Sequence, residues 1–433
     1  MSPTFRSLHN PNFRRYAAGS LVSNVGLWMQ RVAQDWLVLV LTGSGTALGI
    51  TTGLQFLPVL LLSPYAGVIA DRFDKRRLLQ VTQAAMGVAA LALGLITVLG
   101  VVELWHVYAI AFVFGIASAF DAPARQSFVS EMVDATDLTN AVGLNSATFN
   151  TARILGPGLA GLMIGALGGG VWATGWVILV NAVSYLAVIW QLERMETALL
   201  HTPKRVERAP GALREGVEYV RRQPRMVLIL IMVFFAGTFG MNFQITSALM
   251  ATDVYGKGAG EFGLLGSTMA IGSLAGALMA ARRVHIRLRL LVLAGLGFGV
   301  AEIAAGLMPT YLTFVVVTPL IGFATLTLLN SANSVLQLES DPQLRGRVMA
   351  LYMTIVMGGT PLGSPIIGWI GEAFGARWTL VIGGVLTMAG VGLAVAVFWR
   401  MNRGAPGVLT PAGRAGNVFP RVWDNPAVVR ARK

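Results

Sequence analysis

Long apolar stretches alternate with short polar segments along most of the chain. Each stretch has close to the roughly 20 residues that an α-helix needs to cross a bilayer core, so the pattern predicts twelve membrane-spanning helices. Their expected ranges are 16–42, 46–70, 78–100, 105–127, 139–165, 171–192, 226–250, 261–281, 287–307, 309–334, 345–372 and 375–400. The first stretch is too long for a cleavable signal peptide and has polar residues midway. The pattern therefore predicts an all-α integral membrane protein.

Composition supports this environment and removes several kinds of chemistry. Of the 433 residues, 55% are hydrophobic and only 12% are charged, whereas a soluble domain carries roughly 25% charged residues. The chain has no cysteine, which excludes disulfides, thiolate metal sites and a cysteine nucleophile. Its four histidines fall in loops or at span ends without ligand spacing, and no phosphate-binding glycine loop is present. We therefore expect no metal, no cofactor and no enzyme activity.

The positive charges are concentrated on one side of the predicted membrane. The formal net charge is +13, and the chain has 33 Lys and Arg residues. With the N-terminus inside, 28 of these 33 residues fall in inner segments, and only Lys257 and Arg377 fall in outer ones. Because cytoplasmic loops are enriched in Lys and Arg, this distribution predicts that both termini are cytoplasmic. The basic balance thus indicates topology, and no nucleic-acid partner is expected.

One long polar connection divides the spans into six and six. We predict an N-terminal six-helix bundle over 1–192, a cytoplasmic linker over 193–225, a C-terminal bundle over 226–400 and a basic tail over 401–433. The linker sequence "GALREGVEYVRRQPR" predicts a short amphipathic helix at the cytoplasmic face. The tail is expected to be disordered, with binding to anionic lipid or to a partner as the alternative.

The two halves also repeat each other at an offset of 207 residues. The segment "AFVFGIAS" (111–118) corresponds to "TPLIGFAT" (318–325), and "GPGLAG" (156–161) corresponds to "GSPIIG" (363–368). A parallel repeat of two six-helix halves is typical of major facilitator transporters. The chain therefore resembles the major facilitator superfamily, and the resemblance implies two pseudo-symmetric bundles that rock around a central site.

The segment "GVIADRFDKRR" (67–77) resembles the superfamily's signature between the second and third spans. The resemblance implies a latch that holds the inner side closed, in which Asp71 engages the opposite half with help from a base of span four. The residues assigned to this gating latch are Gly67, Asp71, Arg72, Lys75, Arg76, Arg77, Asp121 and Arg125. The alternative is a charged turn that only sets the topology.

In the fifth span, "NTARILGPGLAG" (150–161) resembles a motif of proton-coupled exporters in the superfamily. Its Gly156, Pro157 and Gly161 predict a bend with a small-residue face, which lets membrane helices pack closely; the alternative is an ordinary Gly/Pro kink. Three longer stretches (27–49, 118–133 and 140–157) resemble the bacterial drug and siderophore exporters related to the enterobactin exporter. The resemblance implies a location in a bacterial-type cell membrane and a monomer.

Few ionisable residues fall within the predicted spans, where each costs at least ~2.5 kcal/mol on insertion scales. Arg31 and Asp35 are four residues apart in span one and can pair on one helical face. We predict that Asp35 is the proton-coupling group, with Arg31 and Arg153 as partners that tune it. A permanent structural pair and an interfacial position are the alternatives. Glu302 in span nine is expected near water, with proton coupling as the alternative.

Polar and aromatic residues near mid-span are candidates for the substrate pathway, and a mixed lining of this kind suits a bulky amphipathic molecule. For each aromatic residue, contact with lipid or a neighbouring helix is the alternative. The candidates are Asn24, Trp28, Gln30, Gln34, Asn145, Phe149, Asn150, Asn242, Gln244 and Tyr352.

These features predict a secondary active transporter that works by alternating access. We expect it to export a small amphipathic organic compound (a drug, siderophore or secondary metabolite) in exchange for protons, driven by the proton gradient. Its expected partners are the lipid bilayer, the small-molecule substrate and protons. Two alternatives stay open: an importer or facilitator of the same fold, and a non-transporting membrane sensor or assembly protein.

Overall fold

The computed structural model describes residues 3–201, 212–283 and 287–402, and this part of the chain contains helices and no strand. The tail beyond residue 402 and the middle of the predicted linker lie outside the described residues.

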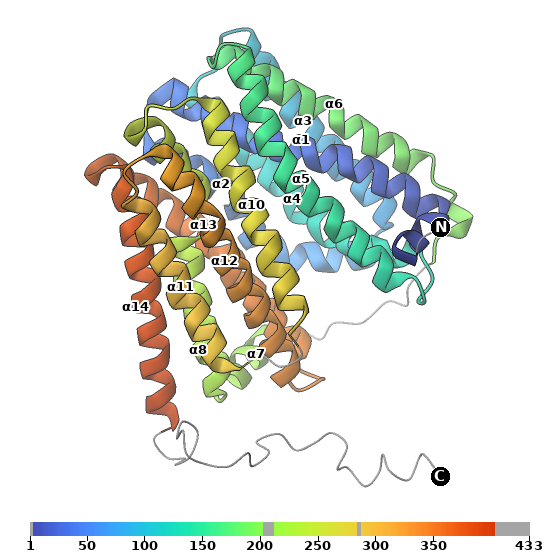
Figure 1. Ribbon diagram of the computed structural model, residues 1–433. Helices are drawn as coiled ribbons and strands as arrows, with labels where there is room; N and C mark the ends of the chain where they lie inside the picture. The colour runs from blue at the N-terminus through green and yellow to red at the C-terminus, as the bar shows by residue number, and fades with distance from the viewer. Residues whose placement is uncertain (1–2, 202–211, 284–286, 403–433) are drawn as a thin grey trace.

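The N-terminal half consists of a short 3-10 helix and six long α-helices (Figure 1). They are η1 (Pro3–His9), α1 (Pro11–Thr42), α2 (Gly45–Arg72), α3 (Lys75–Val98), α4 (Leu104–Met132), α5 (Leu138–Ala166) and α6 (Val171–Glu193). The first long helix begins before the predicted residue 16, because Asn10 caps it. The Asn10 side chain accepts hydrogen bonds from the N–H groups of Asn12 (2.9 Å) and Phe13 (3.1 Å).

The C-terminal half follows the short helices η2 (Thr197–Leu199) and α7 (Ala212–Arg221). It consists of α8 (Pro224–Phe235), η3 (Ala236–Gly240), α9 (Phe243–Leu249), η4 (Met250–Val254), α10 (Ala259–Ala281), α11 (Leu288–Gly306), α12 (Tyr311–Glu339), α13 (Arg345–Phe374) and α14 (Ala376–Asn402). The seventh span was predicted as one helix, but it is divided. Two π-helical turns, η3 and η4, flank α9, and the chain is non-helical at Met241 and Asn242.

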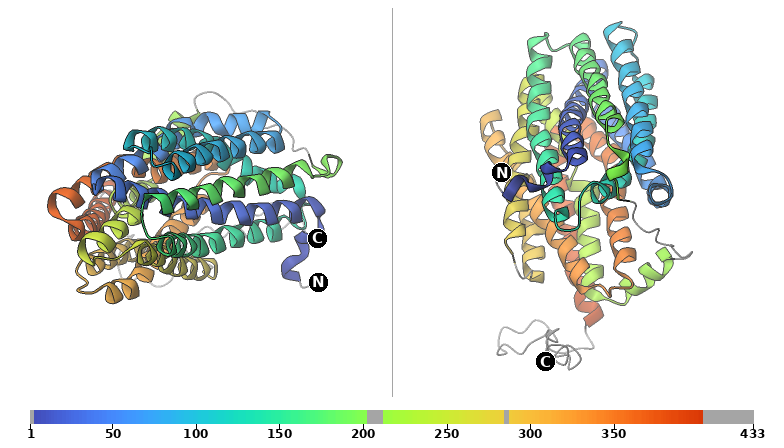
Figure 2. Two further views of the ribbon diagram at one scale, coloured as in Figure 1. Left: turned by 90° about the horizontal axis from the view of Figure 1, so that it is seen from above. Right: turned by 90° about the vertical axis from the view of Figure 1, so that its right-hand side faces the viewer.

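Ten regions of the described chain are long and apolar enough to cross a membrane. Helices α1 and α5, of 32 and 29 residues, do not reach that hydropathy, although they occupy the predicted first and fifth spans. They pack against each other, α1 lies beside α6 in both views of Figure 2, and α5 packs against α10 of the other half. With these two helices the structure has twelve long helical segments in the predicted order, which confirms the predicted fold.

The two bundles meet mainly through two helix pairs, α2 with α13 and α5 with α10. Glycines allow the close approach: a Cβ atom at Gly161 would lie 2.5 Å from the carbonyl oxygen of Ala259, and one at Gly368 would lie 2.2 Å from that of Gly45. Gly161 and Gly368 are equivalent positions of the predicted repeat. Each thus joins its bundle to the first residues of a helix in the other bundle.

These contacts lie toward one end of the molecule, which we call the closed end. At the other end, called the basic end, α1 begins and α6, α12 and α14 terminate. Figure 1 shows the bundles meeting at the upper left and diverging toward the start of α1 and the end of α14. The first half of α2 contacts α13 as far as Leu60 and Gly358. Beyond this point Leu61 and Tyr65 are exposed.

The predicted linker helix forms and attaches to the C-terminal bundle. Glu215 of α7 forms an ion pair with Arg347 of α13. The hydroxyl of Tyr219 accepts a hydrogen bond from the N–H of Asp341 (3.1 Å), and Val220 is buried. The amphipathic pattern of α7 is therefore satisfied by docking at the basic end of α13.

Candidate functional site

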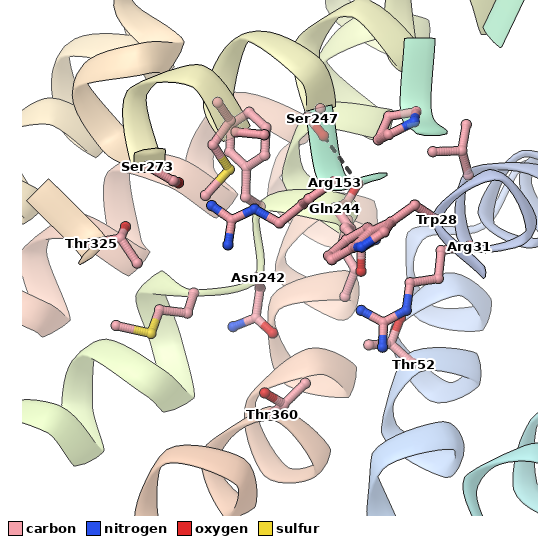
Figure 3. A pocket seen from close by; sticks show the side chains of 18 of the residues that line it. Trp28, Arg31, Thr52, Arg153, Asn242, Gln244, Ser247, Ser273, Thr325 and Thr360 are labelled. Atoms are coloured by element: carbon pink, nitrogen blue, oxygen red, sulfur yellow. Dashed lines mark hydrogen bonds between the residues drawn. The ribbon is translucent and has the colours of Figure 1, made fainter. Parts of the chain in front are cut away.

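A cavity of about 280 Å³ lies between the two bundles (Figure 3). Helices α1, α2 and α5 contribute its N-terminal wall, and the η3–α9 break with α10, α12 and α13 contributes the other. Near the middle of their spans, six predicted residues line it: Trp28, Arg31, Arg153, Pro157, Asn242 and Gln244. This is the position at which transporters of this architecture bind substrate.

Two arginines supply the charge of the cavity, and no Asp or Glu is among its lining residues. The Arg31 guanidinium lies 4.8 Å from the ring centre of Trp28 and 5.5 Å from that of Phe56, within cation–π range. The Nε atom of Arg31 is buried and has no hydrogen-bond partner in the described part of the chain. In the close-up, the Arg153 side chain projects into the cavity from α5 (Figure 3).

Asp35 lies one helical turn from Arg31 and behind the cavity wall. Its side chain is 6% exposed, and its Oδ2 atom is buried without a partner among the described residues. No ion pair within 4.0 Å joins Asp35 to Arg31 in the described structure, although their spacing predicted that they could pair. The guanidinium instead occupies the faces of the aromatic rings.

The broken segment of span seven forms the opposite wall. Asn242 donates from Nδ2 to the carbonyl oxygen of Thr238 (2.8 Å) and accepts at Oδ1 from the hydroxyl of Ser364 (2.9 Å). Both ends of this amide are therefore held, and its position is fixed. Gln244, two residues further on in α9, makes no side-chain hydrogen bond in the described part and is free to meet a ligand.

The predicted exporter motif connects three helices beside the cavity. A Cβ atom at Gly156 would lie 2.4 Å from Cβ of Trp28, so only glycine lets α5 pack this closely on α1. The carbonyl oxygen of Pro157 lies 2.3 Å from where a Cβ of Gly263 would be, and Gly161 approaches the start of α10 as described above. The motif thus joins the substrate cavity to the closed end.

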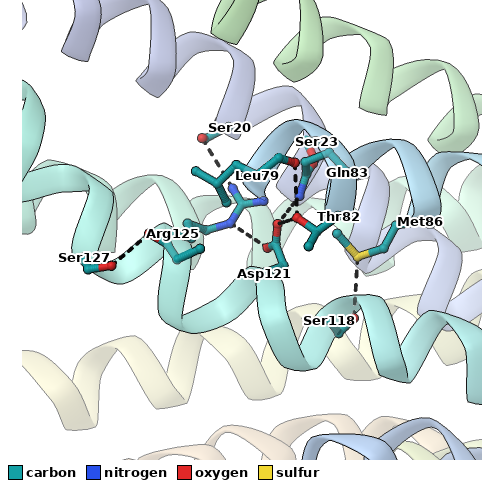
Figure 4. Close-up of polar contacts among 11 residues, drawn as sticks. Ser20, Ser23, Leu79, Thr82, Gln83, Met86, Ser118, Asp121, Arg125 and Ser127 are labelled. Atoms are coloured by element: carbon teal, nitrogen blue, oxygen red, sulfur yellow. Dashed lines mark hydrogen bonds and ion pairs between the residues drawn. The ribbon is translucent and has the colours of Figure 1, made fainter. Parts of the chain in front are cut away.

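Asp121 and Arg125 form a hydrogen-bonded cluster inside the N-terminal bundle (Figure 4). The Asp121 carboxylate accepts from Arg125 Nε (3.0 Å), Thr82 Oγ1 (3.0 Å) and Gln83 Nε2 (2.7 Å). Arg125 also reaches the hydroxyl of Ser20 at 3.4 Å. Every partner comes from α1, α3 or α4, so this cluster connects helices of one bundle.

The remaining residues assigned to the latch lie at the basic end of the same bundle. Lys75 forms a largely buried ion pair with Glu131, and Arg76 donates to the carbonyl oxygens of Leu192 (2.6 Å) and Glu193 (3.0 Å). Gly67 is half-buried in α2, and Arg72 and Arg77 are exposed; the side chain of Asp71 lies outside the described part. Among the described side chains of this set, no hydrogen bond or ion pair reaches the C-terminal bundle.

Seven other pathway candidates do not line the cavity. Gln30 accepts a hydrogen bond from Asn181 within the N-terminal bundle, and Tyr352 donates to the carbonyl oxygen of Leu329 (3.0 Å) within the other bundle. Asn24 and Gln34 are also buried. Asn145, Phe149 and Asn150 lie on the part of α5 toward the basic end, and Phe149 packs edge-on against Trp28 with ring centres 5.9 Å apart.

Sequence reasoning missed several lining residues and misplaced one acid. Phe56, Phe262, Ser273, Thr325 and Thr360 line the cavity, but nothing in their apolar spans distinguishes them from residues that face lipid. The expectation that Glu302 lies near water is wrong, because it is only 2% exposed. Packing of α14 against α11 buries it. In the described residues, no group of three or more His, Asp or Glu side chains could hold a metal ion.

Comparisons with known proteins agree with this architecture. Residues 2–405 match the family described as transmembrane secretion effector, of the major facilitator type. The chain is 24% identical to the staphyloferrin A transporter of Staphylococcus aureus over 90% of its own length and 96% of that protein. It is 27% identical to the multidrug efflux pump Tap of Mycolicibacterium fortuitum, over 84% of the chain and 90% of the pump. It is 22% identical to macrolide efflux protein A of Streptococcus pyogenes, over 85% of the chain and 91% of that protein.

Solved structures share the fold at low sequence identity. A bacterial homologue of the human lysosomal transporter Spinster superimposes with a TM-score of 0.67 at 16% identity, covering 95% of this chain and all of that one. The nucleoside transporter NupG gives a TM-score of 0.68 at 13% identity, over 89% and 99% of the two chains. These likenesses establish the fold alone.

Proposed function

The chain belongs to the transmembrane secretion effector family of major facilitator transporters, and we propose that it exports a small amphipathic organic compound in exchange for protons. The observation that carries this proposal is the central cavity. Both bundles line it, glycine contacts close the molecule on one side of it, and the bundles diverge on the other. A cavity of this kind serves alternating access, in which two bundles rock around a fixed site.

The distribution of Lys and Arg supports a cytoplasmic position for the basic end. On this orientation the described arrangement is open toward the cytoplasm, where an exporter collects its substrate. For the cavity to open outward, the glycine contacts at the closed end must separate. The latch residues around Asp71 and Arg72 would then meet the C-terminal bundle and close the basic end.

The lining supports a substrate that combines apolar surface with oxygen atoms that accept hydrogen bonds. Trp28, Phe56 and Phe262 offer aromatic faces, while Arg153 offers guanidinium donors. The names of the relatives include a siderophore, macrolides and multiple drugs, and compounds of these classes carry both kinds of surface. Mixed linings of this kind are common in small-molecule sites.

Proton exchange is proposed to act through Arg31. Arginine keeps its charge throughout the working pH range, so a carboxylate at Asp35, one turn away, attracts it. When Asp35 carries a proton, that attraction is lost and Arg31 stays on the rings of Trp28 and Phe56, as in the described structure. There it occupies part of the cavity. Proton and substrate therefore exclude each other, which is the condition for exchange.

The test uses inside-out vesicles from cells that express the protein. Acidifying the vesicle interior, which corresponds to the outside of the cell, should drive uptake of a siderophore, macrolide or dye from a compound panel. A protonophore should collapse that uptake. The matched controls are vesicles with Asp35→Asn and with Asp35→Glu, since glutamate keeps the titratable group.

The contrary outcomes separate the alternatives. Uptake that ignores the protonophore would favour a facilitator, and release from preloaded vesicles under the same gradient would favour an importer. A wild-type protein that moves and binds no compound of the panel would favour a sensor or assembly protein.

A further inference from the structure

A second buried acid lies in the C-terminal bundle, away from the cavity. Glu302 is on α11, and its Oε2 atom is buried without a hydrogen-bond partner among the described residues. The other glutamates at the ends of this bundle have partners. Glu339 pairs with Arg225 (2.9 Å), and Glu372 accepts from the hydroxyl of Ser44 (2.6 Å) across the bundle interface.

The surroundings of Glu302 are small and polar. A Cβ atom at Gly384 of α14 would lie 3.2 Å from Cβ of Glu302, and one at Gly383 would lie 3.6 Å from its Oε2 atom. Thr387, one turn further along α14, has a buried hydroxyl with no partner in the described part of the chain. The same holds for Thr238 in η3. Thr387 lies one turn from the glycines that contact Glu302, and its hydroxyl lies 2.9 Å from where a Cβ of Gly240 in η3 would be.

The charged groups on every element packed against α11 leave Glu302 unpaired. On α14, Arg377 donates to the carbonyl oxygens of Gly306 (2.9 Å) and Met308 (2.8 Å), and Arg400 lies at the far end. The charges of α8 and α12 are the Arg225–Glu339 pair at the basic end, and η3 has none. No ion pair within 4.0 Å involves Glu302 in the described structure.

We infer that Glu302 is a second proton-binding site of the transporter, loaded from the closed end. An unpaired carboxylate at this depth costs several kcal/mol, whereas the neutral acid can donate to a neighbouring oxygen. Glu302 is four residues from the end of α11, or about 6 Å at 1.5 Å per residue. Water reaches it when the closed end opens.

The π-helical turn connects this site to the cavity. The carbonyl oxygen of Phe239 in η3 lies 2.8 Å from where a Cβ of Gly383 would be. The residues that follow directly, Met241 and Asn242, line the cavity. π-Helical turns are frequent at functional sites. A change in the protonation of Glu302 thus acts on the same segment that holds Asn242. The transport consequence rests on the proposed function.

Infrared spectroscopy of the purified protein in lipid nanodiscs tests proton binding without transport. A neutral carboxylic acid gives a carbonyl band that a carboxylate lacks. We expect Glu302→Gln to remove one component of this band at neutral pH. Asp35→Asn should leave that component in place, and the component should weaken as the pH rises. The control is Glu339→Gln, which removes an ion-paired acid and should leave the band unchanged. No difference between wild type and Glu302→Gln would overturn the inference.

Vesicle transport tests the role in coupling. One proton that moves down a gradient of one pH unit can drive a tenfold concentration ratio of the substrate. If Glu302 carries one proton per cycle, Glu302→Gln should therefore lower steady-state accumulation about tenfold for each pH unit of the gradient. Glu302→Asp should restore part of the loss, and it replaces the glutamine variant if that protein does not fold. A lost band with unchanged accumulation and pH profile would identify a structural acid and reject proton coupling. Absence of wild-type transport would contradict the proposed function while the infrared result still decides whether Glu302 binds a proton.

Discussion

Two arginine–aspartate pairs in the N-terminal bundle have the same four-residue spacing but different structures. Asp121 and Arg125 on α4 form an ion pair with 3.0 Å between the atoms, and Thr82 and Gln83 donate to the same carboxylate. On α1, Arg31 and Asp35 form no ion pair within the described structure. The Arg31 guanidinium lies on aromatic rings instead, and Asp35 Oδ2 has no described partner.

The order of the residues and their neighbours explain this difference. An acid that precedes its base by four residues pairs better on a helix than the reverse order, and only the α4 pair has the acid first. Trp28 and Phe56 also compete for Arg31, whereas Thr82 and Gln83 of α3 donate hydrogen bonds to Asp121. The hydrogen-bonded Asp121–Arg125 pair suits a fixed contact between helices. The unpaired Arg31 and Asp35 suit groups whose protonation or position changes during transport.

The largest effect is expected for Asp35→Asn. Asparagine is neutral like the protonated acid, so Arg31 should stay on the rings of Trp28 and Phe56 and exclude the substrate, and pH-driven accumulation should fall to the level seen with a protonophore. Exchange of labelled for unlabelled substrate should fall as well, because it needs the part of the cavity that Arg31 occupies. Both are measured in the same vesicles. Full pH-driven accumulation in this variant would reject Asp35 as the coupling group.

Breaking the bonded pair should mainly affect stability. Arg125→Gln leaves the Asp121 carboxylate without its counter-charge, and removing one partner of a buried pair costs about 3–5 kcal/mol. The matched variant Arg31→Gln breaks no ion pair and should lower the free energy of unfolding much less. Denaturant unfolding in detergent measures both variants. Equal losses would show that the two pairs do not differ in the folded protein.

A smaller loss is expected at Gln83, one of the two donors to Asp121 besides Arg125. Gln83→Met keeps the length of the side chain but removes the 2.7 Å hydrogen bond to the carboxylate, and a hydrogen bond to a charged group contributes about 1.5–3 kcal/mol. The control is Gln80→Met on the same helix, which removes a hydrogen bond to the exposed side of Glu193. A loss no greater than that of the control would mean that Arg125 and Thr82 satisfy Asp121 without Gln83.

The smallest effect concerns Trp28, whose ring holds the Arg31 guanidinium away from Asp35. A double-mutant cycle on Arg31 and Asp35 should give a coupling free energy near zero in the wild-type background. In a Trp28→Leu background Arg31 loses a cation–π contact of about 0.5–2 kcal/mol, and the coupling should rise to about 0.5–1 kcal/mol. An unchanged coupling would show that Trp28 does not hold Arg31 away from Asp35.

The sequence by itself determined the order of the twelve long helical segments and the repeat of the two halves. Crossing a membrane is a local property, because each helix satisfies its own backbone hydrogen bonds and needs only length and apolar side chains. Polar and charged residues within the spans also marked Arg31, Arg153 and Asn242 as candidates, and all three line the cavity. Local motifs also located Gly156 and Gly161 at close helix contacts.

Only the tertiary structure decided which side chains face the cavity and which polar groups are paired. In a membrane helix the faces toward lipid and toward the protein are both apolar, so the pattern cannot distinguish Phe56 in the cavity from Leu61 on the surface. Spacing showed that Arg31 and Asp35 could meet, but the rings of Trp28 and Phe56 decided that they do not. The burial of Glu302 likewise depends on glycines of α14, some 80 residues away in the chain, and no local pattern on α11 contains that contact.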